Sequence, residues 1–138
     1  MAGFSNSLAN AIINTTLRGQ AFPTIRTTFF ALFTADPTDA FTSGTEVSAG
    51  WYARQAAGAF AAPASGATFN STRVEFPPVT GAPVTVTHIG ILEGASASDG
   101  TATLLYSEAL PTARTLQIND VFAVDSQTLT GDMTIALL

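Results

Sequence analysis

Short runs of residues that favour β-strands dominate the chain, and turn-forming connections separate them. The runs are rich in β-branched and aromatic residues, whereas connections such as "PPVTGAP", "EGASASDG" and "LPT" (110–112) carry Gly, Pro, Ser and Asp. The runs span residues 27–35, 51–56, 71–76, 84–92, 101–109, 113–118, 121–125 and 133–138. No alternation of strands with helices is present. The spacing predicts a mainly β protein, an antiparallel β-sandwich, jelly roll or small barrel.

The segment before these runs is the one helix candidate. Ser5, Asn6 or Ser7 is a suitable N-cap, and Gly19 stops the pattern. The apolar residues at near-helical spacing are Phe4 ahead of the cap, then Leu8, Ile12, Ile13 and Leu17. The alternative is an arm that orders only against a partner. The sequence thus predicts an N-terminal helix or arm over 1–19 and a single β-sandwich domain over 20–138.

The run at 27–35, "TTFFALFTA", is apolar on both alternating faces. This pattern predicts a strand buried on both sides, and the N-terminal helix is one element that would cover it. Hydrophobic residues make up 46% of the chain and charged residues only 11%, against a typical ~25% charged. So few charges indicate that part of the surface meets other protein.

Charge and composition also exclude several classes of function. The net charge is −5 and the five basic residues, all arginine, are scattered, which argues against nucleic-acid binding. The chain has no cysteine, so a disulfide framework, a thiolate metal site and a cysteine nucleophile are excluded. No run reaches the ~18 apolar residues of a membrane span, and the start lacks the pattern of a signal peptide. We expect a soluble chain made in the cytoplasm.

Catalytic chemistry would have to involve His88, the only histidine. A Ser-His-Asp triad has no G-x-S-x-G elbow here, and carboxylates occur singly, without the spacing of a metal loop. No glycine-rich loop leads from a strand into a helix to hold phosphate. We therefore expect no enzyme activity, no cofactor and no metal. A small hydrolase with two converging carboxylates is kept as an alternative hypothesis.

Within "VTVTHIGILEG" (84–94) the apolar side of a regular strand switches near His88, from valines before it to isoleucines after it. Either both faces are covered there, or a bulge near His88 and Gly90 re-aims the strand. Both residues are interpreted as structural. Trp51 and Tyr52 are adjacent, so in a strand they would point to opposite faces and offer a surface aromatic for sugar stacking. The interpretation we favour is that Trp51 packs inside and Tyr52 hydrogen-bonds at the rim.

The order of motifs resembles a family of small β-rich virion proteins of tailed bacteriophages, described variously as tail-fibre-like or as capsid cement (decoration) proteins. The matching runs are "FFALFTADP" (29–37), "EVSAGWYARQA" (46–56), "VTHIGILEG" (86–94), "LLYSEAL" (104–110) and "TLQINDVFAV" (115–124). Trp51 stands where the family usually has a small residue, and Leu92 where an aromatic is common. The resemblance implies no catalytic residues.

The resemblance leaves a choice between head and tail. The chain is short and lacks the heptads or the repetitive shaft of a fibre, which favours a capsid cement protein. It would bind the major capsid protein at the capsid surface of the virion, as a homotrimer, without nucleic acid or membrane. Its predicted contact residues are Phe4, Leu8, Ile12 and Ile13. The alternative is a tail-tip or tail-fibre-associated module that is structural or binds host glycans.

Overall fold

The computed structural model describes residues 3–126 and confirms a mainly β, antiparallel fold with one short helix. The elements are β1 (Gly3–Phe4), α1 (Asn6–Arg18), β2 (Thr27–Phe33), β3 (Gln55–Ala56), β4 (Val74–Glu75), β5 (Val84–Gly94), β6 (Thr103–Leu116) and β7 (Ala123–Val124). Five strands form one sheet in the order β1-β6-β5-β2-β3, and β4 pairs with β7. The predicted run at 133–138 lies outside the described residues.

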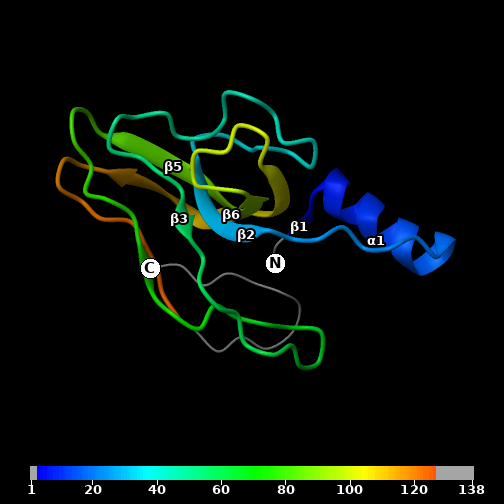
Figure 1. Cartoon of the computed structure of the whole chain (residues 1–138). Helices are drawn as coiled ribbons and strands as arrows, with labels where there is room; N and C mark the ends of the chain where they lie inside the picture. Colours follow the sequence, from blue (N-terminus) through cyan, green and yellow to red (C-terminus); the bar gives the residue numbers. More distant parts are fainter. Residues whose placement is uncertain (1–2, 127–138) are drawn as a thin grey trace.

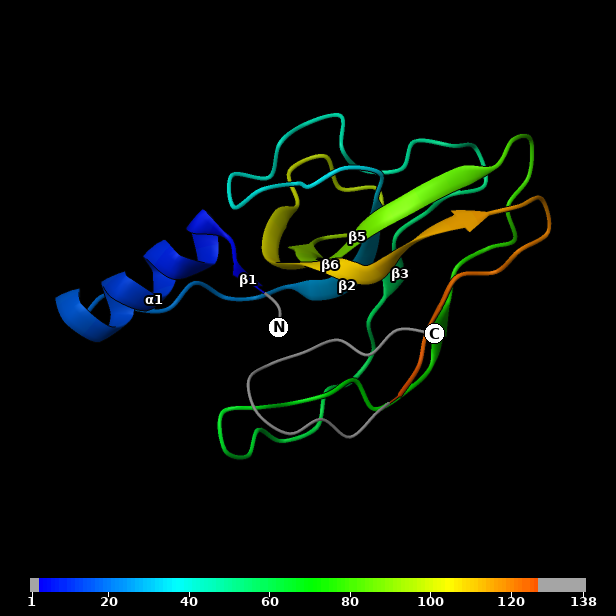
Figure 2. The ribbon, with the colours of Figure 1, turned by 180° about the vertical axis from the view of Figure 1, so that it is seen from behind.

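The long strands β2, β5 and β6 form the middle of the sheet (Figure 1). Helix α1 projects from one end of the molecule, and the β6–β7 connection lies at the opposite end (Figures 1 and 2). Within the described part of the chain, no helix is long and apolar enough to cross a membrane.

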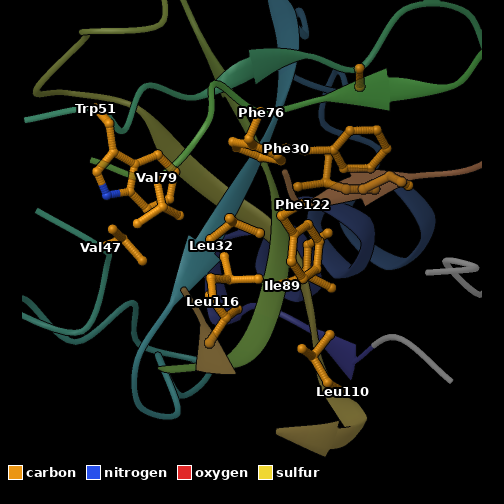
Figure 3. Packing of buried hydrophobic residues seen from close by; sticks show 14 of the residues in the cluster. Phe30, Leu32, Val47, Trp51, Phe76, Val79, Ile89, Leu110, Leu116 and Phe122 are labelled. Carbon is orange, nitrogen blue, oxygen red and sulfur yellow. The ribbon is translucent and has the colours of Figure 1, made fainter. Parts of the chain in front are cut away.

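The main core lies between the sheet and the layer that contains the β4–β7 ribbon, which gives a sandwich-like arrangement (Figure 3). Phe30, Leu32 and Ile89 supply the sheet side and are completely buried. Phe76 and Phe122 face them from the other layer, with their ring centroids 6.1 Å apart in an edge-to-face contact. Burial of aromatic and branched side chains of this kind is the main stabilising contribution to folding.

A second, smaller cluster covers the other face of the sheet. It consists of Ala31, Phe33, Leu92 and Leu104, with Phe41 packed against them. The predicted burial of β2 on both faces is therefore confirmed. The expected cover by the N-terminal helix is wrong for this strand: Phe41, from the loop after β2, packs on Phe33 at 6.2 Å, whereas α1 lies against β1 and β6.

Two predicted strands and their separating turn are one element in the structure. The runs at 101–109 and 113–118 join in the 14-residue strand β6, so the expected connection at 110–112 is wrong. Residues 110–113 form a bulge opposite Thr87, where the ladder between β5 and β6 is interrupted. Pro111 lies in this bulge, where its missing N–H costs no ladder hydrogen bond. Three other runs, 51–56, 71–76 and 121–125, shrink to the two-residue strands β3, β4 and β7.

The irregularity predicted near His88 is confirmed, because the register of β5 against β6 shifts between Val86 and His88. Both faces are also covered at this point, since Ile89 belongs to the main core and Leu92 to the second cluster. Gly90 lies between them, where an added Cβ would come within 2.9 Å of the Phe33 ring. The glycine thus leaves room for the Phe33 and Leu104 side chains to lie against the strand at this point.

Replacing His88 with glutamine is expected to lower the free energy of unfolding by less than about 1 kcal/mol. The half-buried imidazole makes one short contact, 2.8 Å from Nδ1 to the Thr87 hydroxyl, and its Nε2 lies 4.0 Å from the exposed Asp36 carboxylate. Glutamine retains a side-chain donor and acceptor at this position. Urea unfolding with an unchanged slope would measure the loss; a loss above 2 kcal/mol would contradict so modest a role.

Candidate interaction surface at the N-terminal arm

Residues 3–26, here called the arm, comprise β1, α1 and the return segment that leads to β2. Helix α1 forms because both of its ends are capped. The Ser5 hydroxyl accepts a hydrogen bond from the Leu8 N–H at 3.1 Å, and Gly19 adopts a left-handed φ of 65° that ends the helix. The predicted cap, stop and helical periodicity are confirmed by these contacts.

The arm is attached to the body at both of its ends. At the first end, the Ser5 N–H donates to the Leu105 carbonyl at 2.9 Å, and β1 pairs with β6. At the other end, Arg26 makes two hydrogen bonds to the Glu93 carboxylate at 2.9 and 3.0 Å. Its remaining amino group reaches Asp99 at 3.2 Å. The arm is thus positioned firmly at its base while α1 projects away from the sheet (Figure 2).

Helix α1 leaves part of its apolar face uncovered. Leu8 is buried in the main core and Ile12 packs partly against it, but Ile13 is 49% exposed and Leu17 is 80% exposed. At about 100° per residue, these four side chains fall within one half of the helix circumference. A 13-residue helix is only marginally stable in water by itself. The exposed part of this face, formed by Ile13 and Leu17, therefore has the properties of a contact surface.

Exposed apolar side chains are concentrated in the arm. Of the seven exposed large hydrophobic residues in the described part of the chain, five lie within residues 4–25: Phe4, Ile13, Leu17, Phe22 and Ile25. Such concentrations are typical of protein–protein contact sites, whereas single exposed apolar residues need no explanation.

A groove of about 200 Å³ lies between α1 and the return segment. Leu8 and Ala11 line it from the helix, Phe22 and Ile25 from the return segment, and Leu105 from β6. The polar part of its wall comes from Ser7, Thr24, Glu93 and Thr103. The arm therefore presents both a projecting apolar helix face and an apolar depression.

Two arginines hold the loop after β5 in place beneath the arm. Arg26 and Arg54 both reach Asp99, the first at its carboxylate and the second at its carbonyl oxygen at 3.0 Å. The hydrogen bonds from Arg26 lower the pKa of Glu93. Hydrogen bonds from the Thr101 side chain and from backbone N–H groups lower the pKa of Asp99. Both carboxylates thus stay ionised and keep the base of the arm rigid.

Tyr52 belongs to an internal hydrogen-bonded chain. Its hydroxyl accepts from the Leu32 N–H at 3.1 Å and donates to Glu46 at 2.7 Å, and Arg54 binds both oxygens of Glu46 at 2.8 Å. Burial, followed by the hydrogen bond to Glu46, raises the pKa of Tyr52. Its ring lies between Trp51 and Phe76, each 6.0 Å away.

The favoured interpretation of Trp51 as packed and Tyr52 as hydrogen-bonded is therefore confirmed, and the alternative of a surface aromatic at Trp51 is wrong. Trp51 is only 8% exposed, and residues 51–52 lie in a turn before β3, so the alternation expected of a strand does not apply. Both rings pack into the main core, Trp51 as a member and Tyr52 against its edge. Trp51 therefore offers no open face on which a sugar would stack, and the Tyr52 ring is stacked on Phe76.

The four predicted contact residues have different environments. Phe4 is 49% exposed and makes an edge-to-face contact with Tyr106 at 5.4 Å. Leu8 and Ile12 pack on the chain's own body, whereas Ile13 is open to solvent. Sequence reasoning overlooked Phe22 and Ile25 as exposed apolar residues and the clamp of Arg26 and Arg54. One pattern in the sequence could have indicated the apolar character of this whole segment, since no acidic residue precedes Asp36.

Within residues 3–126, no three His, Asp or Glu side chains converge in a way that could hold a metal ion.

The family model described as "Podophage GP4 fiber I protein gp80" matches residues 3–132 of the chain. The comparison with curated proteins returned no match.

Proposed function

Because the chain belongs to the family of the podophage GP4 fiber I protein gp80, we propose that it is a structural subunit of a phage virion, associated with a tail fibre. The arm would be its assembly contact. The observation that carries this proposal is the exposed apolar face of α1, which is capped at both ends and rigidly attached at its base. A helix built in this way is stabilised when a neighbouring protein covers it.

The family match favours the tail-fibre alternative over the capsid cement protein that we preferred from the sequence. Within that alternative, the structural role is better supported than glycan binding, because the rings of Trp51 and Tyr52 are packed against other side chains. We further propose that the protein has no catalytic activity, cofactor or metal, that it does not bind nucleic acid or membrane, and that it assembles as a homotrimer.

Replacing Ile13 with asparagine is expected to reduce incorporation of the subunit into virions at least tenfold. The substitution places a polar amide in the exposed apolar face and leaves the buried Leu8 and the caps intact. A loss of about 1.4 kcal/mol at a contact lowers the binding constant tenfold. Quantitative protein analysis of purified virions measures the number of copies.

The matched control is Ile118→Asn. Ile118 is 51% exposed against 49% for Ile13, and it lies in the β6–β7 connection at the end of the molecule opposite to α1. Normal incorporation of this variant with loss of the Ile13 variant would support the arm as the contact. Equal incorporation of both variants would refute it.

The number of copies of the natural protein per virion tests the tail assignment. Hundreds of copies, rather than at most a few dozen, would contradict that assignment and favour a capsid cement protein.

A further inference from the structure

Part of the connection after β2, residues 36–42, reaches the base of α1 and is called here the 36–42 loop. Its Asp39 carbonyl oxygen accepts a hydrogen bond from the Asn6 N–H at 2.8 Å. Asn6 is the first residue of α1, and its N–H is one of the donors for which a helix has no acceptor of its own. The loop, drawn in cyan, lies beside the start of the helix in both views of the molecule (Figures 1 and 2). It therefore supplies a contact that the arm itself does not provide.

Two residues of the 36–42 loop adopt a backbone conformation that their side chains disfavour. Thr38 has a φ of 56° and Phe41 a φ of 57°. A positive φ is uncommon for any residue other than glycine, and it is an outlier for a β-branched or bulky one. Such strain persists only where the surrounding contacts require it, and it is concentrated at functional positions. The strain therefore indicates that this loop does more than connect two strands.

Contacts on both sides of Asp39 hold the 36–42 loop in this conformation. Before Asp39, Pro37 is completely buried, and its carbonyl oxygen accepts from the Thr42 N–H at 2.6 Å. After Asp39, the Phe41 ring packs on Phe33 in the second cluster. The Asp39 carbonyl is thus directed at α1 by a loop that is anchored on either side of it.

The base of α1 is held from both faces of the main sheet. Leu8 belongs to the main core on one face, whereas Phe41 of the 36–42 loop belongs to the second cluster on the other face. Ser5 lies between them and is hydrogen-bonded to β6. A helix attached at one point is free to pivot about it, and contacts on both sides of that point fix its direction. Ile13 and Leu17 lie farther along the helix, so their positions depend on this direction.

We propose that the 36–42 loop fixes the direction in which α1 projects, and thereby orients the exposed Ile13 and Leu17 for the partner that covers them. This inference rests on the proposed role of the arm as the assembly contact, and it adds the element that positions the arm. A helix whose direction is fixed before binding loses less conformational entropy when its partner binds. Asp39 and Phe41 are thus positioning residues for the assembly contact.

Replacing Asn6 with proline tests the contact between the loop and the helix. Proline is favoured at the first position of a helix. Ser5 before it already has the extended backbone, with φ of −69° and ψ of 161°, that a following proline requires. The substitution therefore removes the N–H that donates to Asp39 and leaves the start of the helix intact. Asn6→Ala is the matched control, because it removes the side chain and keeps that N–H.

The direction of α1 is measured by pulsed electron paramagnetic resonance, as the distribution of distances between two spin labels. One label is attached at Thr16→Cys on α1 and the other at Ala113→Cys on β6, both exposed positions. The absence of cysteine from the natural chain makes the labelling selective. We expect Asn6→Pro to widen the distribution at least 1.5-fold and Asn6→Ala to leave it unchanged.

A second pair of variants separates the loop from a general loss of packing. The Phe41 ring contacts Phe33 at 6.2 Å and the Phe60 ring contacts Phe30 at 6.3 Å, both edge-to-face, and both Phe41 and Phe60 are half-buried. Only Phe41 belongs to the 36–42 loop. We expect Phe41→Ala to widen the distribution and Phe60→Ala to leave it unchanged. Equal widening in these two variants would overturn the inference.

An unchanged distribution in Asn6→Pro would also overturn it, as would equal widening in Asn6→Ala. The number of subunits per virion separates this inference from the proposed function, and we expect Asn6→Pro to be incorporated at least threefold less than the natural protein. A widened distribution together with normal incorporation of both Asn6→Pro and Ile13→Asn would contradict the arm as the assembly contact. Loss of Ile13→Asn from virions, with an unchanged distribution in Asn6→Pro, would contradict only the role of the loop.

Discussion

Replacing Arg54 with methionine is expected to lower the free energy of unfolding by about 2–3 kcal/mol. The Arg54 side chain is only 14% exposed and its partner Glu46 only 21%. The substitution removes two hydrogen bonds to that carboxylate, which then keeps the Tyr52 hydroxyl as its hydrogen-bond donor. A partly buried carboxylate without its counter-ion is costly, because water cannot fully replace the lost interaction.

The matched control for Arg54 is Arg73→Met. Arg73 pairs with Glu75 at 2.9 Å, but these side chains are 44% and 57% exposed, so we expect a loss of at most about 1 kcal/mol. The double variant Glu46→Gln with Arg54→Met should recover part of the loss of the single variant. Urea midpoints at constant slope measure all three changes. Equal losses at Arg54 and Arg73 would show that the inner pair has no special role.

Replacing Gly90 with alanine is expected to lower the free energy of unfolding by about 2 kcal/mol through overpacking. An added Cβ would approach the Phe33 ring to 2.9 Å, Leu104 to 3.0 Å and the Tyr106 carbonyl oxygen to 3.1 Å. The carbonyl belongs to the backbone of β6, and Phe33 is completely buried. Neither neighbour can move without disturbing the central strands.

Gly100 is the control for this substitution, because nothing lies within 4 Å of the position of its Cβ and its φ is not in the left-handed region. Gly100→Ala should leave stability unchanged or raise it by up to about 1 kcal/mol, since alanine restricts the unfolded chain. Thermal and urea unfolding of both variants provide the comparison. Tolerance of alanine at residue 90 would mean that the Phe33 and Leu104 side chains can move away from this strand more easily than their burial implies.

Local features of the chain were predictable because they depend on residues close together in sequence. The bounds of α1 follow from Ser5, the apolar periodicity and Gly19, all within one short segment. The switch of apolar sides at His88 correctly indicated an irregular strand. The turn assigned to residues 110–112 was wrong, because the local signal of Pro111 does not reveal that the strand bulges there and continues.

The sequence by itself determined the β class, the helix with its two caps, and the absence of cysteine. The tertiary structure decided which apolar residues of the arm stay exposed, because Leu8 and Ile13 are equivalent in sequence and differ only in whether the body lies against them. It also brought together Arg26 with Glu93 and Arg54 with Asp99, which are 67 and 45 residues apart. Such pairs depend on strand order and register, and these depend on how the whole sheet buries its two faces.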